Sequence, residues 1–206
     1  MSCYWHGTSS EEAYAQIARD RVLRPLRDPY GKYQGGISTP MKGRVYVSKD
    51  PNYALIYAIG GDYAGTAFPI KDSRYGCLFR VEVPASADVV IDEDELGELA
   101  AEERVDWLSD LAREVSDGKM YGPELDRIPL WDAAKDGDYD AWIRLGHLLH
   151  AALRPPDMRR LFEYAKNYAV LGEVHVVHGY RIDKTRTEEM RRGDIESALS
   201  VSKKLF

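Results

Sequence analysis

The feature of this sequence that most constrains its fold is a long helical stretch between two β-prone parts of the chain. From Asp92 to Lys166 apolar residues recur at helical spacing in several stripes, whereas strand-like segments lie on either side. The chain has 206 residues, which suits one domain or one domain with a large insertion. We therefore expect an α+β fold, with an N-terminal core part at 1–91, a helical insertion at 92–166 and a C-terminal core part at 167–206.

Before the insertion, predicted strands alternate with predicted helices. The β-prone runs lie at Cys3–His6, Arg44–Ser48, Cys77–Val83 and Val89–Ile91. A helix is predicted to start at Ser9, where Glu12 completes a capping box, and another at Asp50, an N-cap followed by a proline. Asp92 and Glu95 form a similar capping pair at the start of the insertion.

Two segments rich in glycine and tyrosine, 25–42 and 60–76, are predicted to be long loops beside a cleft, since long ordered loops often carry function. After the insertion, Glu173–Ile182 is predicted to be a strand. A short amphipathic helix is predicted near Ile195–Leu199.

Composition excludes several classes of protein. Only two cysteines are present, Cys3 and Cys77, and no Cys/His cluster has zinc spacing, so we expect neither a disulfide framework nor a metal site. The net charge of −6 disfavours broad nucleic-acid binding, and the basic segments Arg154–Arg160 and Lys184–Arg192 fit solvated helix faces better. With no signal-peptide pattern and no membrane-length apolar run, we expect a cytoplasmic protein without a membrane partner.

Two polar positions on the predicted strands have settings typical of ligand sites. His6 lies near the end of the first strand, and Gly7 after it lets a flat ligand approach the backbone closely. Glu173 opens an otherwise apolar strand, where a carboxylate is unfavourable unless it is paired or functional. Taken singly, His6 fits a hydrogen-bonded structural histidine, and Glu173 fits a water-exposed carboxylate at a strand edge equally well.

Tyrosines form a second candidate feature. Strand alternation puts Tyr46 and Ser48 on one face and the two valines between Arg44 and Ser48 on the other. On the next predicted helix Tyr53 and Tyr57 are four residues apart and share a face. A strand tyrosine and a helix tyrosine are thus placed to clamp a planar ring, although chance placement is an alternative in a chain with 14 tyrosines.

These elements together resemble a known family. An N-terminal strand with HG, a strand tyrosine before a short tyrosine-bearing helix, and a late strand opening with Glu resemble the H-Y-E signature of ADP-ribosyltransferases, in their diphtheria-toxin-like and poly(ADP-ribose) polymerase-like branch. Tyr46 and Tyr57 are eleven positions apart, similar to the two ring-clamping tyrosines of that family. The resemblance covers Tyr4 to about Ile91 and then Glu173–Ile182. It implies an α+β, split β-sheet core that binds NAD without a metal, with a helical insertion before the last catalytic strand.

The resemblance also implies roles for single residues. His6 would bind a hydroxyl of the nicotinamide ribose, and Gly7 would offer its backbone to the nicotinamide amide. Tyr46 and Tyr57 would stack on the nicotinamide ring, and Glu173 would stabilise the cation that forms as nicotinamide leaves. The implied catalytic residues are Glu173, His6 and Tyr46. The implied NAD-binding residues lie on or beside the same two strands and helix: His6, Gly7, Thr8, Tyr46, Ser48, Tyr53 and Tyr57.

The sequence departs from the family pattern at two positions. Ala54 stands where polymerase-type members have a serine that binds the amide, and Leu171 breaks the Q/E-x-E pattern of arginine-modifying toxins. The resemblance therefore implies a mono-ADP-ribosyltransferase, in the role of a toxin or effector, that releases nicotinamide and modifies an unidentified cytoplasmic acceptor other than arginine. An NAD glycohydrolase and a catalytically silent NAD- or partner-binding module on the same fold are alternatives that the sequence leaves open.

Overall fold

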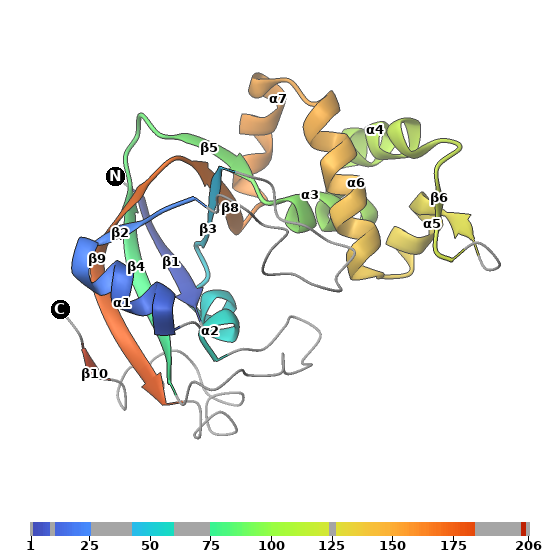
Figure 1. The fold of residues 1–206 in the computed structure, drawn as a ribbon. Coiled ribbons are helices and arrows are strands. Elements are labelled where there is room, and N and C mark those ends of the chain that lie inside the picture. The colour runs from blue at the N-terminus through green and yellow to red at the C-terminus, as the bar shows by residue number, and fades with distance from the viewer. Residues whose placement is uncertain are drawn as a thin grey trace. The chain divides into compact units, whose positions relative to one another are not determined.

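The computed structural model describes residues 2–8, 11–25, 43–59, 75–123, 127–183 and 203–204, and its strands and helices confirm the α+β class (Figure 1). The chain divides into two compact units. The described residues of 1–26, 43–88 and 170–206 form the first unit, and those of 89–169 form the second. The division falls within strands β5 (Asp88–Ile91) and β8 (Asn167–Leu171), which are neighbours in the sheet.

The first unit is built on antiparallel strands in the order β10-β9-β4-β1-β3, with β2 paired to β9 (Figure 1). Their bounds are β1 (Ser2–Thr8), β2 (Val22–Leu23), β3 (Arg44–Ser48), β4 (Tyr75–Val83), β9 (Val174–Asp183) and β10 (Lys203–Lys204). Every residue of β1 pairs with a residue of β4, in a register that runs from Ser2 opposite Val83 to Thr8 opposite Cys77. The predicted strands before the insertion are thus confirmed, whereas β2 was not predicted.

Helix α2 (Pro51–Ile59) starts as the sequence predicts. The backbone N–H of Asn52 donates to Oδ1 of Asp50 at 2.9 Å, which is an N-cap bond, and Pro51 occupies the first helical position. The helix packs on β1 and β4. Its start is therefore fixed by local chemistry, at the point where β3 ends.

Two glycines let α2 lie directly on the strands. A Cβ at Gly7 would stand 1.8 Å from the carbonyl oxygen of Ala54, and one at Gly76 would stand 1.6 Å from that of Ala58. Both distances are shorter than any real contact, so the close approach of helix and sheet requires glycine at both positions. The apolar side chains of α2 complete this layer with Leu78 of β4, which is fully buried.

Alternation along β1 and β4 defines a second buried face. Because Gly7 and its partner Leu78 face α2, their neighbours His6 and Phe79 point to the opposite side of the sheet. Phe79 is fully buried there, and helix α1 (Glu11–Asp20) packs against β2 and β4. Both faces of β4 are therefore core, which makes it the central strand of the first unit.

The two cysteines differ in their surroundings. Cys3 on β1 is exposed and accepts a hydrogen bond from Nε of Arg80 at 2.7 Å. Cys77 on β4 is buried and only 3% exposed. Neither is joined in a disulfide bond within the described residues.

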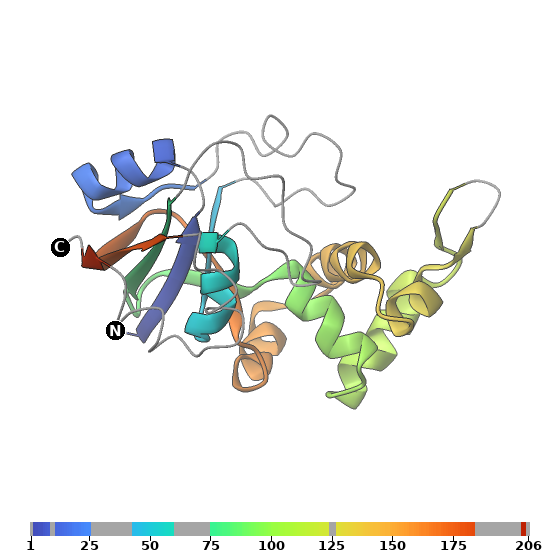
Figure 2. The same ribbon diagram turned by 90° about the horizontal axis from the view of Figure 1, so that it is seen from below.

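The second unit is mainly helical (Figure 1 and Figure 2). Its elements are α3 (Glu93–Ala101), α4 (Asp106–Ser116), α5 (Leu130–Lys135), α6 (Tyr139–Ala152), α7 (Pro155–Arg160), the 3₁₀ helix η1 (Leu161–Glu163) and the hairpin β6 (Met120–Tyr121)–β7 (Ile128–Pro129). Helices α3, α4 and α5 all pack against α6. The predicted helical character of this stretch is confirmed, but the hairpin and β8 were not predicted.

Close packing of α3 on α6 also depends on glycine. A Cβ at Gly97 would stand 2.0 Å from the carbonyl oxygen of Trp142, and one at Gly146 would stand 1.8 Å from that of Glu93. Each helix thus presents one glycine to the backbone of the other. The two helices approach as closely as their main chains allow, and their crossing point is fixed.

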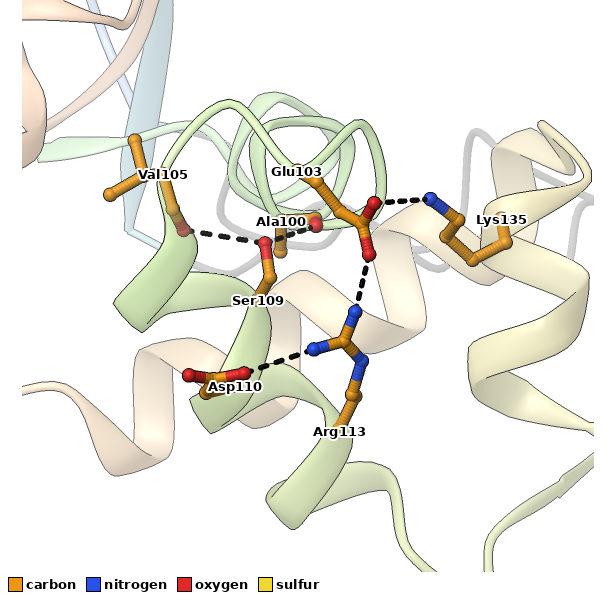
Figure 3. Close-up of polar contacts among 7 residues, drawn as sticks. All are labelled: Ala100, Glu103, Val105, Ser109, Asp110, Arg113 and Lys135. Carbon is orange, nitrogen blue, oxygen red and sulfur yellow. Dashed lines mark hydrogen bonds and ion pairs between the residues drawn. The ribbon is translucent and has the colours of Figure 1, made fainter.

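A polar network ties the end of α3 to α4 and α5 (Figure 3). Glu103 follows α3 with a left-handed φ of 55°, and its carboxylate contacts Arg113 of α4 and, at 3.2 Å, Lys135 of α5. Ser109 of α4 donates to the carbonyl oxygen of Ala100 at 2.8 Å. A residue other than glycine is unfavourable at such a φ. The side-chain contacts of Glu103 therefore offset the backbone strain at this position.

Several predictions lie outside the described residues. These are the helix start at Ser9, the loop residues 26–42 and 60–74, the helix near Ile195–Leu199 and the basic segment Lys184–Arg192. Across the part of the chain that the structure describes, no helix has the length and apolar character needed to span a membrane.

Candidate functional site

The imidazole of His6 links β1 to β3. Its Nδ1 lies 2.8 Å from the carbonyl oxygen of Tyr46. Because a carbonyl only accepts hydrogen bonds, Nδ1 carries the proton and Nε2 presents a lone pair. No described residue hydrogen-bonds Nε2. Burial lowers the pKa of His6, and the bond to Tyr46 opposes this shift, so the ring is neutral at pH 7.

Tyr46 lies next to Gly7 across the β1–β3 pair. Trp5 faces Ser48 in the register, so the next facing positions on the same side are Gly7 and Tyr46. Tyr46 is half-buried, whereas Val47 beside it is only 3% exposed. The predicted alternation is confirmed, with the valines in the core and Tyr46 on the α2 side of the sheet.

The two tyrosines of α2 share a face, as predicted, and contact each other. Their ring centroids are 5.4 Å apart and the hydroxyls of Tyr53 and Tyr57 are 3.2 Å apart. Ala54 faces the sheet, and Leu55 packs toward β4 and β9. Since successive helical residues are about 100° apart, Tyr53 and Tyr57 lie on the other flank, toward β3 and Tyr46. Three half-buried tyrosines thus gather on one side of α2.

The structure gives two predicted NAD-binding positions, Gly7 and Ser48, a structural role. Gly7 is needed for the packing of α2, which fills the space expected for a flat ligand on that side of the strand. Ser48 is only 2% exposed, and its hydroxyl accepts from the backbone N–H of Asp50 at 3.0 Å. Thr8 is half-buried opposite Cys77. Helix packing thus accounts for glycine at position 7, and a contact from its backbone to a ligand stays a prediction.

Glu173 does not lie where the resemblance implies. It precedes β9 rather than opening it, directly after Gly172, which has a φ of 118°. Its side chain is 60% exposed and forms an ion pair with Nε of Arg24 at 3.3 Å. Of the two interpretations of Glu173 above, the structure supports the exposed carboxylate at a strand edge.

The strand register separates Glu173 from His6. His6 faces Phe79 of β4, which faces Gly179 of β9, six residues beyond Glu173. Strands rise about 3.3 Å per residue and lie about 4.8 Å apart. With the bulge in β9 taken into account, the Cα atoms of His6 and Glu173 are therefore roughly 16 Å apart along the strands and roughly 10 Å apart across them. The prediction that His6, Tyr46 and Glu173 line one pocket is wrong, because β4 lies between β1 and β9.

Sequence reasoning missed a group of buried carboxylates in the second unit. Glu93, Asp94 and Glu95, the first residues of α3, are 3%, 8% and 5% exposed. Asp92 makes no side-chain cap bond, contrary to the prediction. Burial raises the pKa of Asp92 well above its usual value, and the charges of Asp94 and Glu93 add to this shift. Four consecutive acidic residues beside apolar Leu96 were the available signal.

Glu95 ties α3 to the start of β8. Its Oε1 accepts from the backbone N–H of Lys166 at 2.9 Å, and its Oε2 accepts from Nδ2 of Asn167 at 2.6 Å. Burial raises the pKa of Glu95, and these two hydrogen bonds oppose the shift. Oδ1 of Asn167 is buried and has no hydrogen-bond partner among the described residues. The pair is a structural tie between two elements distant in sequence.

The candidate site thus comprises a neutral histidine on one face of the sheet and three tyrosines on the α2 side, in the first unit of an α+β protein. Within the described residues, no group of three His, Cys, Asp or Glu side chains is arranged to hold a metal ion. Comparison of the chain with models of protein families, with curated proteins and with solved structures found no match.

Proposed function

We propose that the first unit binds NAD on an ADP-ribosyltransferase-like core, with the nicotinamide-ribose end at His6 and Tyr46. The observation that carries this proposal is the hydrogen bond from Nδ1 of His6 to Tyr46, 2.8 Å long. It fixes the tautomer, so that Nε2 is an acceptor for a donor such as a ribose hydroxyl. The lowered pKa of His6 keeps that acceptor unprotonated at neutral pH.

The tyrosines support a planar ligand. Tyr46, Tyr53 and Tyr57 lie on one side of α2 and are each half-buried, so an aromatic ring has partners there. Stacking contributes about 1 kcal/mol per ring pair beyond the burial of apolar area. These rings lie on the α2 side of the sheet, whereas the imidazole of His6 points to the opposite side, so the rings support a planar ligand independently of the Nε2 acceptor.

The position of Glu173 favours binding without transfer. Cleavage of the bond between ribose and nicotinamide produces a cation-like sugar, which a carboxylate beside it stabilises. Glu173 is exposed and paired with Arg24, on the far side of β4 from His6. We therefore favour an NAD-binding module. Mono-ADP-ribosyl transfer to an acceptor is the second candidate, favoured by the His6–Tyr46 contact, and it requires a carboxylate other than Glu173.

Calorimetry with NAD tests the proposal. The native protein is expected to bind, and His6→Ala to weaken binding about tenfold through loss of one hydrogen bond and its positioning. His175→Ala is the matched control, because His175 is an exposed histidine on β9. Glu173→Gln is expected to bind as the native protein does.

Chromatography of NAD after incubation separates the two candidates. No release of nicotinamide supports the binding module, whereas release that survives Glu173→Gln without accumulation of free ADP-ribose supports transfer through another carboxylate. Absence of NAD binding by the native protein would falsify both. A loss of binding in Glu173→Gln would contradict the separation of Glu173 from His6.

A further inference from the structure

The second unit carries a hollow of about 360 Å³ that the proposed function does not use. It lies among β6, the start of α5 and the middle of α6. Its apolar lining comes from Met120, Leu130, Ile143 and Leu148. Met120 is 50% exposed at the rim, whereas Leu130 is 4% exposed and forms part of the floor. The hollow thus offers apolar surface that the chain leaves open to solvent.

The charges of the lining have one sign. Lys119 and Arg144 belong to it, and none of the described lining residues is acidic. The whole chain has a net charge of −6, so this local positive charge runs against the overall balance. A cationic rim around an apolar floor complements a ligand that is both acidic and apolar.

Arg144 is held in position by its neighbours. Its guanidinium lies 5.1 Å from the ring centroid of Tyr121, whose hydroxyl donates to Oδ1 of Asp138 at 2.7 Å. The same oxygen caps α6 by accepting from the N–H of Ala141 at 2.9 Å. Asp138 is therefore engaged, and Arg144 presents its charge with little loss of side-chain freedom on binding.

We propose that this hollow docks an acidic peptide segment of a partner protein, which inserts one bulky apolar side chain. The hollow is open to solvent rather than enclosed, and its volume accommodates one large side chain. Acidic residues beside the inserted side chain then meet Lys119 and Arg144. The hollow lies within the second unit, so the proposal is independent of NAD binding.

Fluorescence anisotropy with labelled pentapeptides tests this docking. The probe is a phenylalanine flanked by two glutamates on each side, compared with the same peptide flanked by lysines and with an alanine-centred acidic peptide. We expect the acidic phenylalanine peptide to bind at least about tenfold more tightly than either. Arg144→Glu should weaken it at least about tenfold, whereas Arg160→Glu, another arginine stacked on an aromatic ring, should not.

Other outcomes overturn the proposal. Equal binding of the lysine peptide, no binding at 1 mM peptide (about the weakest affinity of interest), or octanoate binding as tightly as the peptide each reject an acidic peptide partner. Since Arg144→Glu also removes the contact with Tyr121, Lys119→Glu serves as a second variant, with folding checked by circular dichroism. Dimerisation of the native protein that Lys119→Glu abolishes would identify a second copy of the chain as the occupant.

Discussion

The two units treat buried charge in opposite ways. The first keeps its half-buried His6 neutral, and two of its carboxylates, Asp20 and Glu173, are paired with arginine at the surface. The second buries the carboxylates at the start of α3, among them Glu95. One change of pH is therefore expected to change the stability of the two units in opposite directions.

The direction follows from the pKa shifts. Burial lowers the pKa of His6 below 6.5, so its stabilising contribution is present above that pH and is lost as the pH falls. In the second unit burial raises the pKa of Asp92, of Glu95 and, to about 7, of Glu98. A carboxyl group whose pKa is raised by folding stabilises the folded state at pH values below its unfolded pKa. This contribution is lost as the pH rises toward the pKa of the folded state. Acid therefore weakens the first unit and strengthens the second.

The largest expected effect concerns the contact between α3 and α6. We expect the second unit to depend on this contact as strongly as the first unit depends on its sheet. Gly146→Ala places a Cβ 1.8 Å from the carbonyl oxygen of Glu93 and should lower the free energy of unfolding by about 3 kcal/mol. Urea unfolding followed by tryptophan fluorescence measures it. Ala151→Ser, at an exposed position of the same helix, is the control and should change little. Equal stability of the two variants would show that α3 and α6 separate at no cost.

The next effect concerns the buried carboxylate of Glu95. Asn167→Ala removes a donor 2.6 Å from its Oε2 and should lower the free energy of unfolding by about 2–3 kcal/mol. Asn52→Ala, at an exposed position of the first unit, is the matched control. Chemical denaturation at pH 7 measures both. If Asn167→Ala were as stable as the native protein, the second unit would not depend on the hydrogen bond to its buried carboxylate at this position.

Glu98→Gln sharpens the comparison of pH dependence. Burial raises the pKa of Glu98 to about 7, so the native second unit should lose stability between about pH 4.5 and pH 7. The substitution should reduce this loss of stability by about 2 kcal/mol, a value that allows for the partial exposure of the side chain. Hydrogen exchange of α3 and β4 at pH 5 and pH 8 follows each unit separately. Glu114→Gln, at an exposed position of α4, should leave the slope unchanged.

The smallest expected effect separates strain from surface ion pairing at Glu103. Glu103→Ala loses the contacts with Arg113 and Lys135 but keeps the left-handed φ, whereas Glu103→Gly also relieves the strain. The glycine variant should therefore be about 1 kcal/mol more stable than the alanine variant. Thermal unfolding of both variants measures this difference. An alanine variant at least as stable would mean that the backbone at this position is not strained.

Local sequence chemistry predicted the elements around the candidate site. The start of α2 follows from Asp50 and Pro51, because an N-cap and a proline at the first helical position act within a few residues. The two faces of β3 follow from alternation, which also needs no knowledge of other strands. These features could be predicted because their causes lie within the segment itself.

The failed predictions share a different cause. The position of Glu173 depends on which strand lies between β1 and β9, on the bulge in β9 and on the turn at Gly172, and all three are set by tertiary pairing. The purpose of Gly7 also depends on a distant helix. The two-residue strands of the β6–β7 hairpin are too short to show a period. Buried acids at the start of α3 matched the pattern of an exposed helix cap.

The two cysteines of the first unit differ in exposure, so their labelling can report the opening of its sheet. Cys3 is exposed at the start of β1, so a thiol-reactive dye attaches there without mutagenesis. Cys77 is 3% exposed in the central strand β4, and reagent reaches it only when the sheet opens. Counting labels per molecule over time therefore times the opening of the sheet that carries His6, with the first label as internal reference.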